Sequence, residues 1–213
     1  MPRNSLAVKE AADILVRSGA NSVVMGSVYG ASAALIREMR SRNSRAFFAS
    51  ASFIGTSSLF DALSNEAKGV GITQVMPNPF TAATPLSREF QAAMKASDDG
   101  KLSYGAMEGY VAARVFTEAV KRAGAGLTRQ KLIASLESFD ALDIGGFVIR
   151  FSANNHNGSS FTEMTVLGAN RTISLPLLGR GGFQRLWSHT QRTLRHDVEI
   201  QVRLHRRGAM DIS

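Results

Sequence analysis

The chain has 213 residues, of which 44% are hydrophobic and 20% are charged, a composition that is ordinary for a globular protein with a buried core. It contains no cysteine, which excludes disulfides, thiolate nucleophiles and thiolate metal sites. The formal net charge is +8, and half of this excess lies from Arg180 onwards, where seven arginines stand against three acidic residues. The basicity therefore belongs mainly to a C-terminal tail.

The first part of the chain alternates between helical and strand patterns. Asn4 or Ser5 is suited to cap a first helix, and Gly19 is placed to end it. Beyond that helix the pattern predicts strands at 22–25, 46–49 and 69–76, and helices at 31–42 and near 59–63. This order is typical of an α/β fold in which helices cover a parallel sheet.

The second part begins with helices and ends with an alternating pattern. Apolar spacing predicts helices at 85–96 and 103–123, and Thr128 caps a further one. In 145–151 and 161–167 apolar and polar residues alternate with a period of two, which predicts a β-hairpin with Asn157-Gly158 as its turn. After about Thr172 no turn or cap ties the sequence to the rest, and we do not assign it to the core.

The motifs expected of common enzyme classes are missing from the sequence. There is no Gly-x-Ser-x-Gly elbow, no phosphate loop ending in Lys-Ser/Thr, and no Gly-x-Gly-x-x-Gly after a strand. Three of the four histidines lie in the tail at spacings of seven and nine, too wide for a helical pair of metal ligands. We therefore predict a non-enzymatic protein without a cofactor or metal ion.

Three polar segments follow the predicted strands, at 27–30, 50–55 and 77–80. In open α/β sheets ligands bind beyond the carboxyl ends of the strands. These segments offer hydroxyls and aromatic rings without charge, which suits the binding of a small molecule. Tyr29 and Phe53 could equally cap the sheet edge, and the residues alone favour neither interpretation.

Six blocks of sequence carry a resemblance to a known family. They are "RNS" (3–5), "VVMGSVYGASAALIREMR" (23–40), "FFASASFIG" (47–55), "GVGITQVMPNPF" (69–80), the block at 103–124 and the block at 143–172, which ends in "LGANRT". In order and spacing these blocks resemble the periplasmic substrate-binding proteins of branched-chain amino-acid (leucine, isoleucine and valine) ABC importers. The resemblance covers about four-fifths of the chain. It implies the type I periplasmic-binding fold, in which two α/β lobes close on a ligand.

The resemblance also implies a division of the chain. Residues 1–84 would belong to the second lobe, 85–142 would be helices of the first lobe, 143–172 would be a β-hairpin crossing back, and 173–213 would be a basic tail outside the family domain. Members of the family begin with a signal peptide and most of the first lobe, which this sequence lacks. We therefore expect an N-terminally truncated form whose affinity for ligand is weak or absent.

The ligand contacts implied by the resemblance are Ser27, Tyr29, Ser52, Phe53 and Tyr104. Amino-acid-binding members often have a carboxylate in the 50–55 loop to hold the ligand ammonium. The matching position here is Ser52, and no acidic residue lies between Ala46 and Phe60. An amide or an organic acid is therefore a candidate ligand beside an amino acid.

The implied partners are this small molecule and a membrane permease, and the implied location is the periplasm. The N-terminus has no basic head followed by an apolar stretch, so no signal peptide is recognised, and no apolar run reaches the roughly 20 residues of a membrane span. Two alternatives stay open: a ligand-sensing receptor domain, and nucleic-acid binding through the arginine tail, which would depend steeply on salt.

Overall fold

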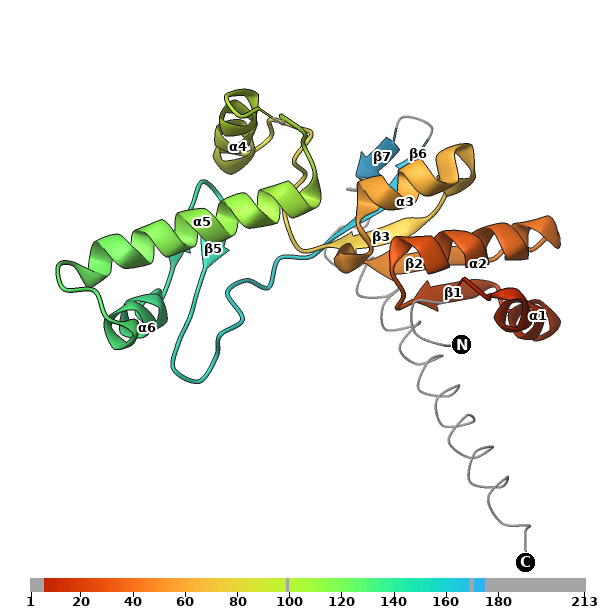
Figure 1. Ribbon diagram of the computed structural model, residues 1–213, viewed down its shortest axis with the longest axis horizontal. Helices are drawn as coiled ribbons and strands as arrows, with labels where there is room; N and C mark the ends of the chain where they lie inside the picture. The colour runs from red at the N-terminus through yellow and green to blue at the C-terminus, as the bar shows by residue number, and fades with distance from the viewer. Residues whose placement is uncertain (1–5, 99, 169–170, 175–213) are drawn as a thin grey trace, which may run out of the picture. The chain divides into compact units, whose positions relative to one another are not determined.

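The fold is described from a computed structural model, which places residues 6–98, 100–168 and 171–174 (Figure 1). The basic tail and the predicted caps Asn4 and Ser5 lie outside these described residues. In none of the described helices is there a stretch both long enough and apolar enough to cross a membrane.

A mixed five-stranded sheet organises the first part of the chain. Its strands, in spatial order, are β1 (Ser22–Met25), β2 (Phe47–Ala51), β3 (Gly71–Gln74), β6 (Glu163–Gly168) and β7 (Arg171–Ser174). The strands β1, β2 and β3 are parallel, as the sequence predicts, whereas β6 runs antiparallel to both β3 and β7. The carboxyl ends of β1, β2 and β3 therefore lie along one edge of the sheet.

Three helices share one core with this sheet, and short 3₁₀ turns follow strand β2 and helix α3. They are α1 (Lys9–Arg17), α2 (Tyr29–Ser41) and α3 (Thr56–Leu63), with the 3₁₀ turns η1 (Ser52–Ile54) and η2 (Ser64–Ala67) on either side of α3. Ile36 and Met39 of α2 are buried with Phe48 of β2 and Ile72 of β3. Burial alternates along β1 and places Val23 and Met25 in this core while Val24 is exposed, as expected of a strand with one covered face.

A second core gathers the helices that follow the sheet. They are α4 (Pro85–Lys95), α5 (Tyr104–Ala123) and α6 (Arg129–Glu137), and the two-stranded ribbon of β4 (Leu142–Asp143) and β5 (Val148–Ile149) packs with them. The predicted stripe of α5 is buried, including Met107 and Val111. Each helix has a side-chain cap, because Thr84, Ser103 and Thr128 accept a backbone N–H from the first turn.

The hairpin predicted between 145–151 and 161–167 is wrong. The strand β5 pairs with β4, and β6 pairs with β3 and β7. Apolar and polar residues alternate here because every second side chain packs into the second core, namely Phe147, Ile149 and Phe151. This burial produces the same period of two as a paired strand. In the Asn157-Gly158 segment the carbonyl of Gly158 accepts from the backbone N–H of Arg150, and the N–H of Asn157 donates to the side chain of Asn155.

Candidate functional site

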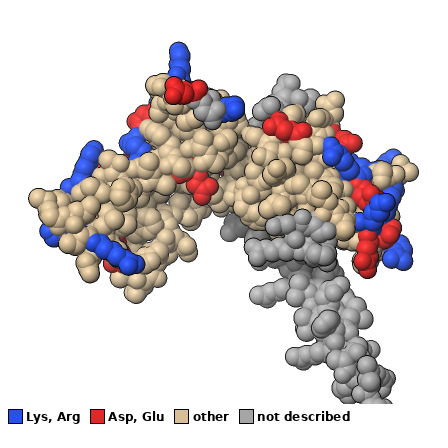
Figure 2. Space-filling model, in the orientation of Figure 1, with Lys and Arg blue, Asp and Glu red and all other residues tan. Residues whose placement is uncertain are grey.

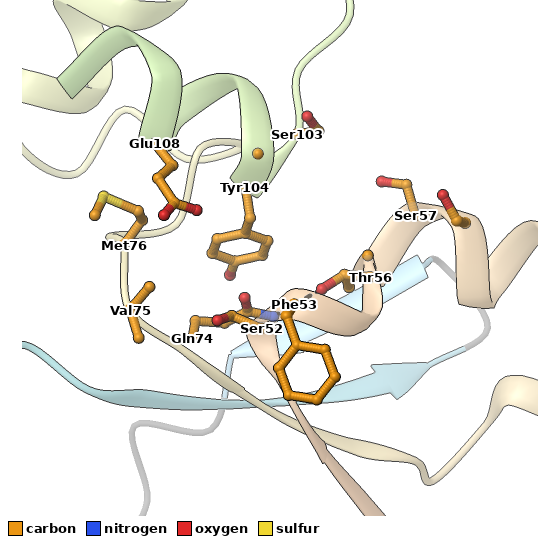
Figure 3. Close-up of a pocket in the computed structure, with 13 residues that line it drawn as sticks. Ser52, Phe53, Thr56, Ser57, Gln74, Val75, Met76, Ser103, Tyr104 and Glu108 are labelled. Carbon is orange, nitrogen blue, oxygen red and sulfur yellow. Dashed lines mark hydrogen bonds between the residues drawn. The ribbon is translucent and has the colours of Figure 1, made fainter. Parts of the chain in front are cut away.

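Three segments that are far apart in the sequence line one pocket of about 380 Å³ (Figure 3). They are the turn after β2 with the start of α3, the end of β3, and the first turn of α5. The lining residues are Ser52, Phe53, Gly55, Thr56, Ser57, Ser58, Gln74, Val75, Met76, Ser103, Tyr104, Gly105 and Glu108. The volume lies within the range of small-molecule sites.

The turn after β2 brings hydroxyl groups to this pocket. The 3₁₀ turn η1 ends at Gly55, whose φ of 75° is the left-handed conformation that glycine adopts without strain. This reversal lets α3 start at Thr56, and it leaves Ser52 and Phe53 on the pocket wall. Phe53 is 61% exposed, so it forms part of the open rim.

Gln74, at the end of β3, is held by a buried polar network. Its amide nitrogen donates to the hydroxyl of Thr56 at 2.8 Å and to the hydroxyl of Thr165 at 3.0 Å. The Thr165 hydroxyl in turn donates to the carbonyl of Ile72 at 3.1 Å, so its oxygen is left to accept from Gln74. Both N–H groups of the amide are therefore used, while its Oε1 is buried without a hydrogen-bond partner.

Tyr104 begins α5 after the cap Ser103 and is only 7% exposed. Its ring meets Phe80 edge to face, with 6.0 Å between the ring centroids. Its hydroxyl is buried without a hydrogen-bond partner, and Figure 3 shows it directed toward Gln74. Burial disfavours the charged phenolate and the carboxylate of Glu163 adds to this effect, so the pKa of Tyr104 is raised above its usual value and the group stays neutral.

Glu108, one turn after Tyr104 on α5, is the only charged residue among the described residues that line the pocket. Its side chain is exposed to solvent, and Figure 3 shows the carboxylate projecting from the helix toward the space between Met76 and Tyr104. The sequence analysis missed this residue, as it missed Gln74. The spacing from Tyr104 could have found it, because residues four apart share one helix face.

The structure brings together three of the five predicted contacts. Ser52, Phe53 and Tyr104 line the pocket, whereas Ser27 and Tyr29 are not among its lining residues. Ser27 shares a hydrogen bond with Ser32 at 2.7 Å between the two hydroxyl oxygens, and Tyr29 opens α2 and is 48% exposed. Both follow β1 at the carboxyl edge of the sheet, the edge at which Ser52 follows β2.

Charged side chains of both signs are interspersed over the face of the described residues shown in Figure 2. Among the described residues several charged side chains form ion pairs, such as Arg37 with Glu66 at 2.9 Å and Arg122 with Glu118 at 2.8 Å. This mixture differs from the single-sign surface that phosphate backbones attract. The alternative of nucleic-acid binding rests on the tail, which lies outside the described residues.

Comparison with known proteins gives matches along most of the chain. The model of a family described as "Periplasmic binding protein" matches residues 2–170. A search of curated proteins found no match.

Solved structures similar to the chain include a possible leucine/isoleucine/valine-binding protein from Rhodopirellula baltica, at 31% identity and a TM-score of 0.78, with 84% of this chain and 50% of that one covered. A substrate-binding periplasmic protein from Ralstonia solanacearum is 33% identical with a TM-score of 0.74, with 82% of this chain and 51% of that one covered. A branched-chain amino acid ABC transporter protein from Thermus thermophilus with bound valine shares the fold at 16% identity and a TM-score of 0.69. The match covers 81% of this chain and 49% of that one. The chain thus spans about half the length of these structures.

Proposed function

Because the chain belongs to the periplasmic binding protein family, we propose that it binds a small molecule as part of the substrate-binding component of an ABC importer. The proposed ligand is an amino acid, an amide or a related organic acid. The proposed partner is the membrane permease that receives this ligand, and the proposed location is the periplasm. The family match and the two relatives above 30% identity support a binding role.

The single observation that carries this proposal is the pair of buried polar atoms in the pocket. Gln74 Oε1 and the Tyr104 hydroxyl come from different segments of the chain and have no hydrogen-bond partner. Leaving a buried polar group unpaired costs about 1–3 kcal/mol, so native proteins rarely retain such groups without a role. Both atoms are closed to solvent in this structure, so a polar ligand would recover this cost where the walls of the pocket move apart around it.

The chemistry of the lining supports binding rather than catalysis. Hydroxyls, an amide and one carboxylate line the pocket, together with Phe53, Val75 and Met76 as apolar surface. None of these described lining residues is a histidine or lysine that could serve as a base beside one of the serines. We therefore propose a non-enzymatic site, as the sequence analysis expects.

We also propose Ser27 and Tyr29 as contacts that a ligand gains at the same sheet edge, beside Ser52, Phe53 and Tyr104. Parallel strands end at a common edge, so the segments after β1 and β2 are neighbours in the sheet. The assignment of 1–84 and 85–142 to two lobes, joined again by 143–172, is part of the same proposal. The two separate hydrophobic cores support this assignment.

A ligand screen with a blocked variant tests the proposal. Ligand-observed NMR on the 213-residue chain, with amino acids, aliphatic amides and organic acids at millimolar concentration, should detect weak binding of at least one compound. Ser57→Phe fills the pocket and should abolish that signal, whereas Ser41→Phe, at the exposed end of α2, should retain it. Failure of every compound to bind, or binding that Ser57→Phe leaves intact, would contradict the proposal.

A further inference from the structure

The pair Asn157-Gly158, which the sequence predicts to be a hairpin turn, lies in a segment without strand pairing, since residues 156–162 belong to no helix or strand. We propose that Asn157 is a modification site, at which the side-chain amide is converted spontaneously to aspartate and isoaspartate. Asn157 is the only asparagine in the sequence that is followed by glycine. The inference is independent of the proposed ligand site, because neither residue of the pair lines that pocket.

The reaction needs only the chain itself and water. The backbone nitrogen of Gly158, after loss of its proton, attacks the side-chain carbonyl carbon of Asn157. A new C–N bond closes a five-membered succinimide ring, and the bond from that carbon to the side-chain nitrogen breaks, so that the nitrogen takes up a proton and leaves as ammonia. Water then adds to one of the two ring carbonyls. Opening on one side gives aspartate, and opening on the other gives isoaspartate, in which the main chain runs through the former side chain.

The attacking nitrogen is free in the folded protein. Within the part of the chain that the structure describes, the N–H of Gly158 donates no hydrogen bond, whereas its carbonyl accepts from the N–H of Arg150 at 2.9 Å. Gly158 also has no Cβ beside the nitrogen, and its backbone can adopt conformations that are closed to other residues. Ring closure therefore meets neither a competing hydrogen bond nor a crowded nitrogen.

The group under attack is equally accessible. Asn157 is exposed, and its side-chain amide has no hydrogen-bond partner among the described residues. Only its backbone N–H is bonded, to the side-chain oxygen of Asn155 at 2.9 Å. Both the side-chain carbonyl and the water that opens the ring can thus reach the site.

The other asparagines lack this combination. The residue after each of them has a side chain or a proline ring, which crowds the nitrogen that would attack. Pro79, after Asn78, has no N–H at all. Ser44, after Asn43, donates its N–H to the carbonyl of Met39 at 3.1 Å, so that its nitrogen is engaged.

Conversion would change both the charge and the backbone at this place. Asn157 and Arg150 line the same hollow of about 360 Å³, and Arg150 is the only charged residue among its described lining residues. A carboxylate at position 157 would therefore be attracted by this arginine. Isoaspartate also adds one carbon to the main chain just before Gly158, which packs so closely that a Cβ there would lie 2.8 Å from the ring of Phe151. The isoaspartate product should thus weaken the hydrogen bond between Gly158 and Arg150.

Peptide mapping by mass spectrometry, on the 213-residue chain incubated at pH 7 and at pH 9, tests the proposal. Each conversion adds about 1 Da, and fragment spectra assign it to a residue. We expect Asn157 to convert roughly tenfold faster than Asn21 or Asn43, because only its attacking nitrogen belongs to a glycine. The rate should be higher at pH 9, since the nitrogen must lose its proton to attack.

Two variants locate the reaction. Asn157→Gln should abolish the conversion at position 157, because the longer side chain would have to close a six-membered ring. Asn154→Gln makes the same change at an exposed asparagine three residues earlier and should leave the rate at Asn157 unaltered. Circular dichroism checks that both variants are folded.

A comparison with the urea-unfolded chain tests the structural part of the argument. Because no hydrogen bond holds the attacking nitrogen, the rate at Asn157 in the folded protein should lie within roughly threefold of the rate in the unfolded chain. At Asn43 folding should slow the reaction. A folded-state rate at Asn157 more than roughly tenfold below that of the unfolded chain overturns the proposal. An equal rate at another described asparagine, or a mass gain that persists at position 157 in Asn157→Gln, does so as well.

Discussion

Replacing Tyr104 by phenylalanine should not destabilise the free protein, although the residue is buried. The substitution removes only the hydroxyl, which has no hydrogen-bond partner, and it retains the ring that packs against Phe80. Because the ligand-free protein derives no hydrogen bond from this group, nothing is lost with it. The pocket gains no unpaired group either, since Gln74 Oε1 is already without a partner.

The size of the expected change in stability follows from two values. Burying an unpaired hydroxyl costs about 1–3 kcal/mol, whereas a hydrogen-bonded hydroxyl stabilises the folded state by roughly 1 kcal/mol. Part of this cost is relieved by adjustment of the surroundings, so we expect the free energy of unfolding of Tyr104→Phe to be unchanged or raised by about 1 kcal/mol. For a chain of this size that gain corresponds to a rise in Tm of about 2–4 °C.

Urea denaturation followed by circular dichroism measures the change, with Thr165→Val as the contrasting variant. Thr165 accepts from Gln74 and donates to Ile72, so its loss leaves buried groups unpaired and should lower the free energy of unfolding by about 1–3 kcal/mol. A loss of 1 kcal/mol or more in Tyr104→Phe would refute the reasoning, because it would show that the hydroxyl is hydrogen-bonded, to Gln74 for example, in the free protein.

Three further predictions concern pH, backbone and core. Because the pKa of Tyr104 is raised in the folded protein, its phenol loses a proton at lower pH in the unfolded chain. The free energy of unfolding should therefore fall as pH rises above about 10, and it should fall less steeply in Tyr104→Phe. Urea denaturation at pH 9 and pH 11 measures both slopes. Gly145→Ala should lower the free energy of unfolding more than Gly146→Ala in urea denaturation. Both glycines have φ near +90°, but only at Gly145 would the new Cβ lie 2.6 Å from the backbone nitrogen of Leu86. Equal losses in the two variants would count against this packing. Phe48→Ala, in the first core, should lower the free energy of unfolding by about 3–5 kcal/mol, and a loss below 1 kcal/mol in the same assay would contradict its burial.

The helices and the parallel strands could be predicted because their determinants are local. The stripe of α5 repeats at helical spacing, Ser103 caps that helix, and Gly19 ends α1 with a φ of 68°. The start of α1 at Lys9 follows no side-chain cap, so a search for capping residues could not locate it.

Long-range pairing could not be predicted in the same way. The strand β6 pairs with β3, from which it is separated by three helices and two short strands, and no local pattern encodes that register. The alternation of Phe147, Ile149 and Phe151 reflects packing on helices, and periodicity cannot distinguish it from strand pairing.

The lining of the pocket could be anticipated in part for a related reason. Ser52 and Phe53 follow a strand directly, where the rule for α/β sheets directs attention, and they do line the pocket. Gln74 and Glu108 line the same pocket but were missed, because their positions depend on segments distant in sequence. The amide of Gln74 is oriented by Thr165, and the carboxylate of Glu108 reaches the pocket through the placement of α5.

Chemical-shift mapping of a ¹⁵N-labelled chain, titrated with a compound that binds in the ligand screen, tests the central claim most directly. The account predicts that backbone amides of 52–58, 74–76 and 103–108 shift with a single dissociation constant, and that the shifts are lost in Ser57→Phe. Shifts confined to other surfaces, such as the hollow beside Tyr110 and Thr117, or no shifts at millimolar ligand, would contradict the claim that these three segments form a ligand site.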